Sequence, residues 1–378
     1  MIIYILIFII LLLYALNPEL FLNAKAKVGI IIILCLFLCF GYMTGSDWRG
    51  YEILYEDLKY GIPSWYSKER GYLYYNLLFQ KLNLNFWPFF IFTKCICFLI
   101  TLLFYKKYSE GKFGWGLLMF FVYSAIFAYI DNPMRNLIAC VIFVFSYKYI
   151  YERNLIKYLI IVFLASTFHL SVLLISPVYF LYKIDIKRSF IYVCLTIIGV
   201  VAIGYQIDLK DYLYSSITMD IFSNGMVYVD NELEQNMGRL FSFGLLWRLF
   251  LFVLIIENKK SIENTTKYGV LLTRLSFFYI IVYLFCNGIP ILGRVAGYLE
   301  LPYFLSLSVL LYSRFFRYKV LLSSLIIVIS FTYMYSTITS NYKYIPYTNY
   351  ITYIFSEKPS FSERNEYNFR KSPYIEKK

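Results

Sequence analysis

The clearest candidate for chemistry in this sequence is an arginine next to a predicted helix start. The run Asp131-Asn-Pro-Met-Arg135 places a capping Asn and a Pro before Arg135, so backbone N–H groups and a guanidinium would face the same anion. In the alternative interpretation, the run is only a helix cap and Arg135 extends to the membrane interface. The spacing indicates a candidate anion site.

A second arginine has similar surroundings. Gly288-Ile-Pro-Ile-Leu-Gly-Arg294 predicts a glycine-containing loop that delivers Arg294 to the mouth of the next helix. Glu300 follows six residues later, so the alternative is a structural ion pair between Arg294 and Glu300. Arg294 is therefore the second candidate anion ligand.

His169 is the single histidine, and it lies in Ala165-Ser-Thr-Phe-His-Leu-Ser171. An imidazole titrates near neutral pH and would accept a proton from a sugar hydroxyl within hydrogen-bond reach. The alternative is a hydrogen-bonded structural histidine. The seven cysteines lie in apolar runs without C-x-x-C zinc spacing, so we expect structural thiols, no metal and no cofactor.

Carboxylates and tyrosines share the segment at 43–85. Asp47 directly follows a predicted span with Tyr51 close behind, and Glu69 precedes an amphipathic stretch that contains Tyr72. Carboxylates beside aromatic rings are typical of sugar binding, although a solvated, charge-balanced loop has the same composition. Both interpretations remain open at this point.

The elements that position these residues are membrane helices. The chain has 378 residues, 60% of them hydrophobic and 16% charged, and its mean hydropathy is +0.61, which excludes a water-soluble fold. A net charge of +13 would suggest nucleic acid in a soluble protein. Here Lys and Arg lie mainly in short turns between apolar runs, where they set topology, so we expect no nucleic-acid partner.

We predict an all-α polytopic membrane protein with about twelve membrane segments. Ten apolar runs are single segments, at 1–16, 28–42, 86–105, 113–129, 134–150, 189–205, 241–256, 268–285, 298–312 and 320–336. The stretch at 155–182 is too long for one span, too short for two full ones, and basic at both ends. It therefore predicts a short helical hairpin, with His169 near its apex.

Loop charges predict the orientation. Loops with two to three basic residues each are expected in the cytoplasm, at 17–27, 106–112, 151–157, 183–188, 257–267 and 313–319. The long loops at 43–85 and 206–240 are then extracytoplasmic. We predict one transmembrane domain over 1–336 and a polar extracytoplasmic C-terminal tail over 337–378, in a multi-pass membrane protein.

The spaced motifs resemble the EpsG family of membrane exopolysaccharide proteins, which is grouped with O-antigen polymerases of the Wzy type. The matching features are Gly45-Ser-Asp47 with Tyr51 and Tyr55, Glu69-Arg-Gly71, Arg135-Asn-Leu-Ile-Ala139, the basic turn from Arg153 to Lys157, Phe168-His-Leu-Ser171, and Arg294 before Tyr298. They cover residues 45–300. The match rests on the order, spacing and membrane context of these short motifs.

The resemblance implies a glycosyltransferase at the outer face of the bacterial inner membrane. It would move a glycan chain from undecaprenyl diphosphate onto the non-reducing end of another lipid-linked repeat unit. We assign the roles as follows: His169, Asp47 and Glu69 are catalytic, Arg135, Arg294 and Arg239 bind the diphosphate, and Tyr51, Tyr72 and Ser171 position the acceptor. The missing nucleotide-binding loop agrees with a reaction that consumes no nucleotide.

The expected partners are the lipid-linked oligosaccharide, the bilayer, and chain-length regulator and flippase proteins. Other classes remain open. A lipid-linked oligosaccharide flippase should show two similar halves, and no internal repeat is visible in the sequence. An O-antigen ligase or another lipid-dependent glycosyltransferase is a closer alternative. A membrane O-acyltransferase would also use a histidine, but its acyl-CoA donor favours a cytoplasmic site.

Overall fold

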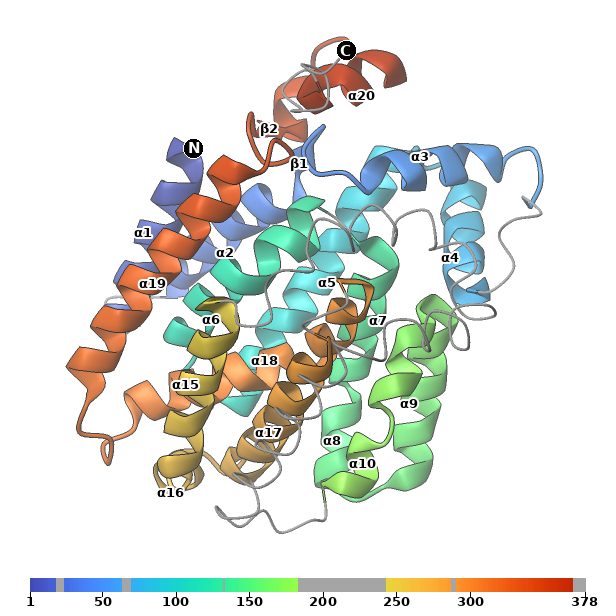
Figure 1. The fold of residues 1–378 in the computed structure, drawn as a ribbon. Coiled ribbons are helices and arrows are strands. Elements are labelled where there is room, and N and C mark those ends of the chain that lie inside the picture. The colour runs from blue at the N-terminus through green and yellow to red at the C-terminus, as the bar shows by residue number, and fades with distance from the viewer. Residues whose placement is uncertain (18–23, 63–68, 132, 183–242, 287–289, 370–378) are drawn as a thin grey trace, which may run out of the picture.

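The computed structural model describes residues 1–17, 24–62, 69–131, 133–182, 243–286 and 290–369. Within these ranges the fold is all-α, as predicted, apart from the two-residue strands β1 (Gly41–Tyr42) and β2 (Thr348–Asn349). The helices pack into one bundle, and α3 lies across one end of it (Figure 1).

Helices make up most of the described chain. The first half contains α1 (Ile2–Leu16), α2 (Ala24–Cys39), α3 (Trp48–Asp57), α4 (Arg70–Lys81), α5 (Phe86–Tyr108), α6 (Gly114–Phe120), α7 (Met134–Val144), α8 (Ser146–Tyr151), α9 (Leu155–Phe168) and α10 (Val178–Leu181). The second half contains α15 (Phe243–Glu257), α16 (Lys259–Glu263), α17 (Gly269–Cys286), α18 (Pro290–Tyr312), α19 (Lys319–Ser340) and α20 (Phe361–Phe369). Three further segments of the described chain have other helical geometry: the π-helix η2 (Phe121–Asp131) and the 3₁₀ helices η3 (Leu170–Ile175) and η4 (Tyr350–Tyr353).

Four helical segments of the described chain are long and apolar enough to cross a membrane: Phe86–Tyr108, Gly114–Asp131, Arg294–Tyr312 and Lys319–Ser340. Shorter apolar helices include α1 and α9. The expected count of about twelve segments is therefore not confirmed. The predicted span at 189–205 and the predicted loop at 206–240 lie outside the described residues.

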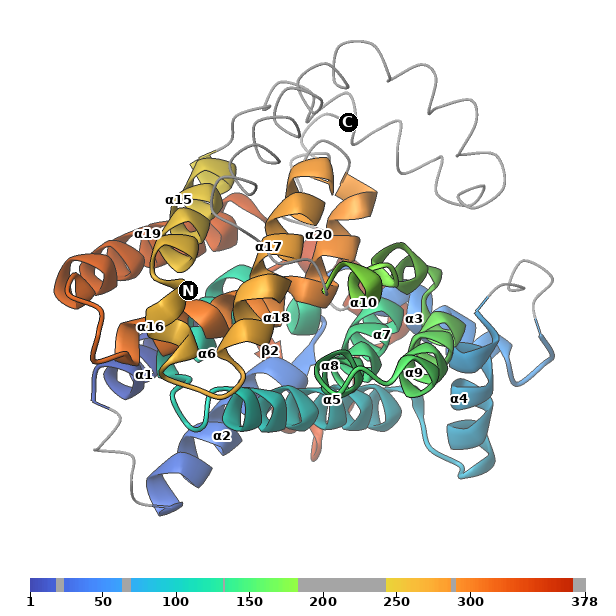
Figure 2. The same ribbon diagram turned by 90° about the horizontal axis from the view of Figure 1, so that it is seen from below.

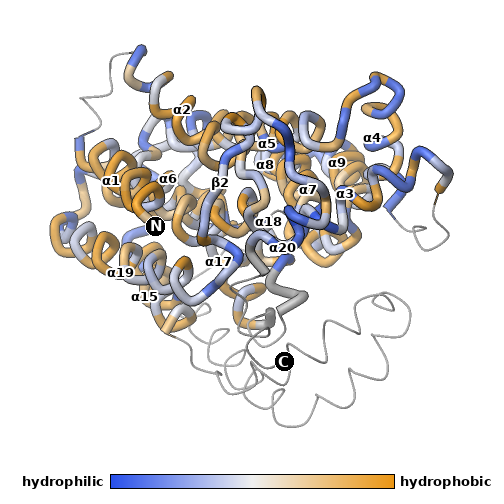
Figure 3. Tube along the Cα trace, turned by 90° about the horizontal axis from the view of Figure 1, so that it is seen from above, coloured by the Kyte–Doolittle hydropathy of each residue, from blue (hydrophilic) through white to orange (hydrophobic). Residues whose placement is uncertain are grey.

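The centre of the bundle is α18, which packs against α17, α6 and α7. Figure 2 shows α18 near the middle of the molecule, with α1 and α9 toward opposite sides. On the outside, apolar side chains such as Val320 and Val328 of α19 and Phe163 of α9 are exposed. Figure 3 shows the hydrophobic colour along α1 and α19 and the hydrophilic colour around α3. An apolar exterior of this kind suits contact with lipid, and the chain is a membrane protein.

The helical hairpin predicted at 155–182 is confirmed. The Asn154 side chain caps α9 by accepting a hydrogen bond from the backbone N–H of Lys157 at 3.1 Å. The chain then turns at His169 and returns through η3 and α10, so that the Tyr158 hydroxyl donates to the Ser176 carbonyl at 2.8 Å. His169 takes extended backbone angles between the two helices and so occupies the apex.

The C-terminal segment folds back onto the end of the bundle that carries α3. β2 pairs antiparallel with β1, in the register Gly41 to Asn349 and Tyr42 to Thr348. Beyond it, Arg364 of α20 donates from Nη1 to both carboxylate oxygens of Glu52 on α3, at 2.9 and 3.0 Å. The N-terminus, α3 and α20 lie at the same end of the bundle (Figure 1).

Candidate functional site

A single buried carboxylate joins two of the predicted site residues. Oε1 of Glu69 lies 2.7 Å from Nδ1 of His169, and Oε2 lies 2.5 Å from Nη1 of Arg135. The three side chains come from the start of α4, the hairpin apex after α9, and the first turn of α7. Residues far apart in sequence therefore form one hydrogen-bonded set.

Close contact between α4 and α9 brings Glu69 to His169. Gly71 makes this approach possible, because a Cβ atom there would lie 2.2 Å from Oγ1 of Thr167 and 2.9 Å from its carbonyl oxygen. Gly71 of the Glu69-Arg-Gly71 motif is therefore needed for the close packing of α4 against α9.

Arg135 contacts the α3 segment as well. Its backbone N–H donates to the Tyr51 hydroxyl at 3.3 Å, and its guanidinium carbon lies 5.9 Å from the Tyr51 ring centre. The Tyr72 ring packs edge-on against Tyr51, with 5.6 Å between centroids, and is fully buried. The Arg135 side chain nevertheless keeps 36% of its surface exposed.

The environment of Glu69 favours its ionised form. Burial raises the pKa of this carboxyl, but the His169 hydrogen bond and the Arg135 charge lower the pKa more, and the net value lies below the ordinary one. Glu69 is therefore a carboxylate at neutral pH. A carboxylate that accepts Nδ1–H fixes the imidazole tautomer in which Nε2 carries the free lone pair.

A second polar cluster surrounds Asp131, at the junction of η2 and α7. Oδ1 of Asp131 accepts from the Ser46 N–H at 2.8 Å and from the Ser46 hydroxyl at 2.6 Å. Its backbone carbonyl accepts from the Asp47 N–H at 3.2 Å, and Lys343 lies 3.4 Å from Oδ2. Gly45 must be glycine here, because its φ is +87° and a Cβ would lie 1.9 Å from the Ile130 carbonyl oxygen.

Asp47, the residue directly before α3, is the predicted site residue within this cluster. Burial and the charge of Asp131 raise its pKa above the ordinary value, while Arg294 and Lys343 oppose the shift. The interaction with Arg294 brings that residue into the neighbourhood of the cluster. The Asp47 N–H contacts Asp131, and the Tyr51 hydroxyl on the following turn contacts Arg135, so the two polar sets adjoin.

Ser171 lies beyond the apex and contacts α18. Its hydroxyl lies 3.0 Å from the Tyr298 hydroxyl, which also accepts from the Asn136 side chain at 3.5 Å. Tyr298 is buried, and its backbone carbonyl accepts a hydrogen bond from Tyr147. Ser171 follows His169 by two residues and is hydrogen-bonded to Tyr298 of α18.

The structure differs from the sequence expectations for Arg294 in two ways. The helix begins at Pro290, earlier than the predicted span at 298–312, so Arg294 lies within the first turns of α18 and not ahead of the helix. The alternative of an Arg294–Glu300 pair is wrong, because six residues on an α-helix separate side chains by about 9 Å along the axis and turn them away from each other. Glu300 lies 3.9 Å from Arg248 and accepts from the Ser124 hydroxyl at 2.7 Å.

Sequence reasoning missed three side chains of the site. Asp131 was seen only as part of a helix start, Lys343 lies in the predicted tail, and Tyr298 only marked the helix after Arg294. Lys343 and Asp131 are too far apart in sequence for a local motif to indicate that they meet. Arg239, predicted to bind the diphosphate, and the predicted capping residue Asn132 lie outside the described residues.

The comparisons with known proteins decide the family. A sequence profile described as the EpsG family matches residues 26–349. The chain belongs to the EpsG family. No curated protein and no solved structure matches it. EpsG is a Wzy-like polymerase family, which suggests a membrane polysaccharide polymerase-like function of glycosyltransferase type. The profile spans every residue of the two polar sets described above, from Ser46 to Lys343.

In this EpsG-family chain the site combines a base and a cation on one carboxylate. The Glu69-bound imidazole offers Nε2 as a proton acceptor, and the Arg135 guanidinium places a positive charge beside it. Activation of a hydroxyl next to a departing anionic group is the chemistry that this pair can perform.

Proposed function

We propose that this protein is a polysaccharide polymerase of the bacterial inner membrane. It transfers a glycan chain from undecaprenyl diphosphate onto the non-reducing end of another lipid-linked repeat unit, at the extracytoplasmic face. The observation that carries the proposal is the Glu69 carboxylate, which bridges His169 and Arg135. Family membership supplies the reaction class, and the bridge supplies groups suited to it.

The proposed step begins with the acceptor hydroxyl. Nε2 of His169 takes its proton while the hydroxyl oxygen forms a bond to the anomeric carbon of the donor glycan. The bond from that carbon to the diphosphate oxygen breaks, and its electron pair remains on undecaprenyl diphosphate. Glu69 orients the imidazole and stabilises its protonated form, as a carboxylate does beside a catalytic histidine.

The departing diphosphate gains negative charge, which cations stabilise most in a site that excludes water. Arg135 and Arg294 are proposed for this role, together with Arg239. Asp47 and the hydroxyls of Tyr51 and Ser171 are proposed to position the acceptor. Tyr72 is buried behind Tyr51, so we propose that it acts by holding the Tyr51 ring.

The test is the banded length distribution of surface polysaccharide in a deletion strain. The strain is complemented with wild type, His169→Ala, Arg135→Ala or the control Lys148→Ala, which removes an exposed partner of Glu152 away from the site. Membrane levels of each variant are measured. We expect His169→Ala and Arg135→Ala to lose long chains and retain single repeat units, while Lys148→Ala matches wild type.

Two results would overturn the proposal in different ways. Loss of single repeat units from the surface together with the long chains would favour a flippase. Full-length polymer in both site variants would show that the Glu69-centred residues do not perform the reaction.

A further inference from the structure

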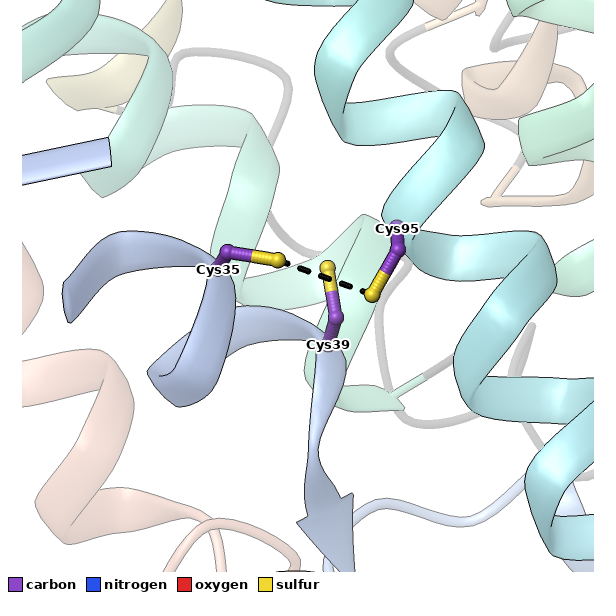
Figure 4. Close-up of side chains that lie close together, drawn as sticks. All are labelled: Cys35, Cys39 and Cys95. Carbon is purple, nitrogen blue, oxygen red and sulfur yellow. Dashed lines mark hydrogen bonds between the residues drawn. The ribbon is translucent and has the colours of Figure 1, made fainter. Parts of the chain in front are cut away.

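Three cysteine side chains converge between α2 and α5, away from the polar sets described above. Cys35 and Cys39 are four residues apart and therefore share a face of α2, and Cys95 faces them from α5 (Figure 4). All three Sγ atoms lie within 4.8 Å of one another, and those of Cys35 and Cys95 are 3.5 Å apart. We propose that these thiols form a binding site for a soft monovalent metal ion, Cu(I).

The sulfur spacing fits a three-coordinate ion. Metal–thiolate bonds are about 2.3 Å long, so three sulfurs around one central ion lie about 4.0 Å from each other. The observed range of 3.5 to 4.8 Å includes this value, so only small side-chain movements are needed to close the site.

The ligand set decides between the thiophilic metals. Structural zinc takes four protein ligands, and among the described residues no fourth Cys, His, Asp or Glu joins this group. Cu(I) favours soft sulfur ligands, and a set of three thiols alone satisfies it. The chemistry of the site therefore points to Cu(I).

The surroundings suit a metal–thiolate group. Lys94, next to Cys95 in sequence, is fully buried and interacts electrostatically with all three cysteines. A Cu(I) ion held by three thiolates carries net negative charge, which the ammonium offsets in a region of low dielectric. Cys39 is buried, whereas Cys35 and Cys95 are half-buried.

The consequence for the fold is a fixed junction between α2 and α5. Cys39 is the last residue of α2, and β1 begins two residues later at Gly41. A bound ion would link the end of α2, directly before β1, to α5. It would stabilise the folded protein in proportion to the ion concentration, because the ligands are not arranged in the unfolded chain.

The test is copper binding by the full chain in detergent, reduced and handled without oxygen. Cu(I) is added, excess is removed with a chromophoric Cu(I) chelator, and bound copper is measured by elemental analysis and by the sulfur-to-copper absorption band. We expect one copper per chain and a higher unfolding midpoint. Both should disappear in Cys35→Ala and Cys95→Ala.

The controls are Cys97→Ala, two residues along α5 and outside the group, and Cys140→Ala on α7, which should bind copper as wild type does. We expect Lys94→Met to weaken binding about tenfold. Copper binding that persists in Cys95→Ala, binding of Zn(II) but no Cu(I) by wild type, or a Cys35–Cys95 disulfide in the protein as purified would overturn the proposal.

Discussion

At the scale of single residues, Glu69 is the side chain on which the proposed site depends. Its two carboxylate oxygens are each used by a partner from a different helix, so its ionisation controls both contacts. Its pKa lies below the ordinary Glu value of 4.5 in the folded protein, which makes the contribution of these contacts to stability dependent on pH.

We expect Glu69→Gln to lower the free energy of unfolding by about 1.5–3 kcal/mol at pH 7, the range for hydrogen bonds to charged groups. A lowered folded pKa gives stability above the unfolded value, and that stability is lost as pH falls through the folded value. The difference between wild type and Glu69→Gln should therefore shrink at acid pH. Denaturant unfolding in detergent at both pH values measures it.

The matched control is Glu56→Gln, which removes an exposed partner of Lys59 on α3. It should change stability little at either pH, because exposed ion pairs contribute about 0–1 kcal/mol. A Glu69→Gln deficit that is equally large at neutral and acid pH would contradict the assignment of an ionised Glu69.

At the scale of elements, the contact between α4 and α9 sets the geometry of the site. The hairpin at 155–182 was predictable because basic residues at both ends of an apolar stretch of that length require a return. The packing of α4 against this hairpin was not predictable. The approach of α4 depends on Gly71 lying against Thr167, a contact that the local pattern of neither helix reveals.

We expect Gly71→Ala to lower stability by about 1–3 kcal/mol and to reduce polymer formation, because overpacking pushes α4 and Glu69 away from His169. Thermal unfolding and polymer length measure the two effects. Gly50→Ala is the control, since its Cβ would meet nothing within 4 Å on an exposed face of α3. Similar losses in both variants would show that the close helix contact is not the cause.

At the scale of the whole molecule, the sequence predicted the membrane class, the all-α fold, the family and several of the residues that meet. Asp47, Tyr51, Glu69, Arg135 and His169 all lie in the two adjoining polar sets. Hydropathy and loop charge are properties of the chain itself, which explains this success.

Contacts between residues that are far apart in sequence could not be predicted from the sequence alone. Lys343 contacts Asp131 near the point where β2 pairs with β1. The two strands are more than 300 residues apart in the sequence. Glu300 lies near Arg248 because α15 and α18 pack side by side. The short sequence spacing of Arg294 and Glu300 suggested a different partner for Glu300. The cysteine group likewise joins positions 35 and 95, so no local motif marks it.

The most direct test of the central claim is a double-mutant cycle on polymer formation. Purified wild type, His169→Ala, Glu69→Gln and the double variant are supplied with the lipid-linked repeat unit in proteoliposomes, and initial rates are compared. Loss of a general base costs about 10²–10⁴-fold. Because Glu69 acts on the reacting hydroxyl through His169, the account predicts that the two single losses do not multiply in the double variant. Loss of the Glu69 contact to Arg135 accounts for any remaining slowing relative to His169→Ala. A wild-type rate in folded His169→Ala, or fully multiplicative losses in the double variant, would contradict the account.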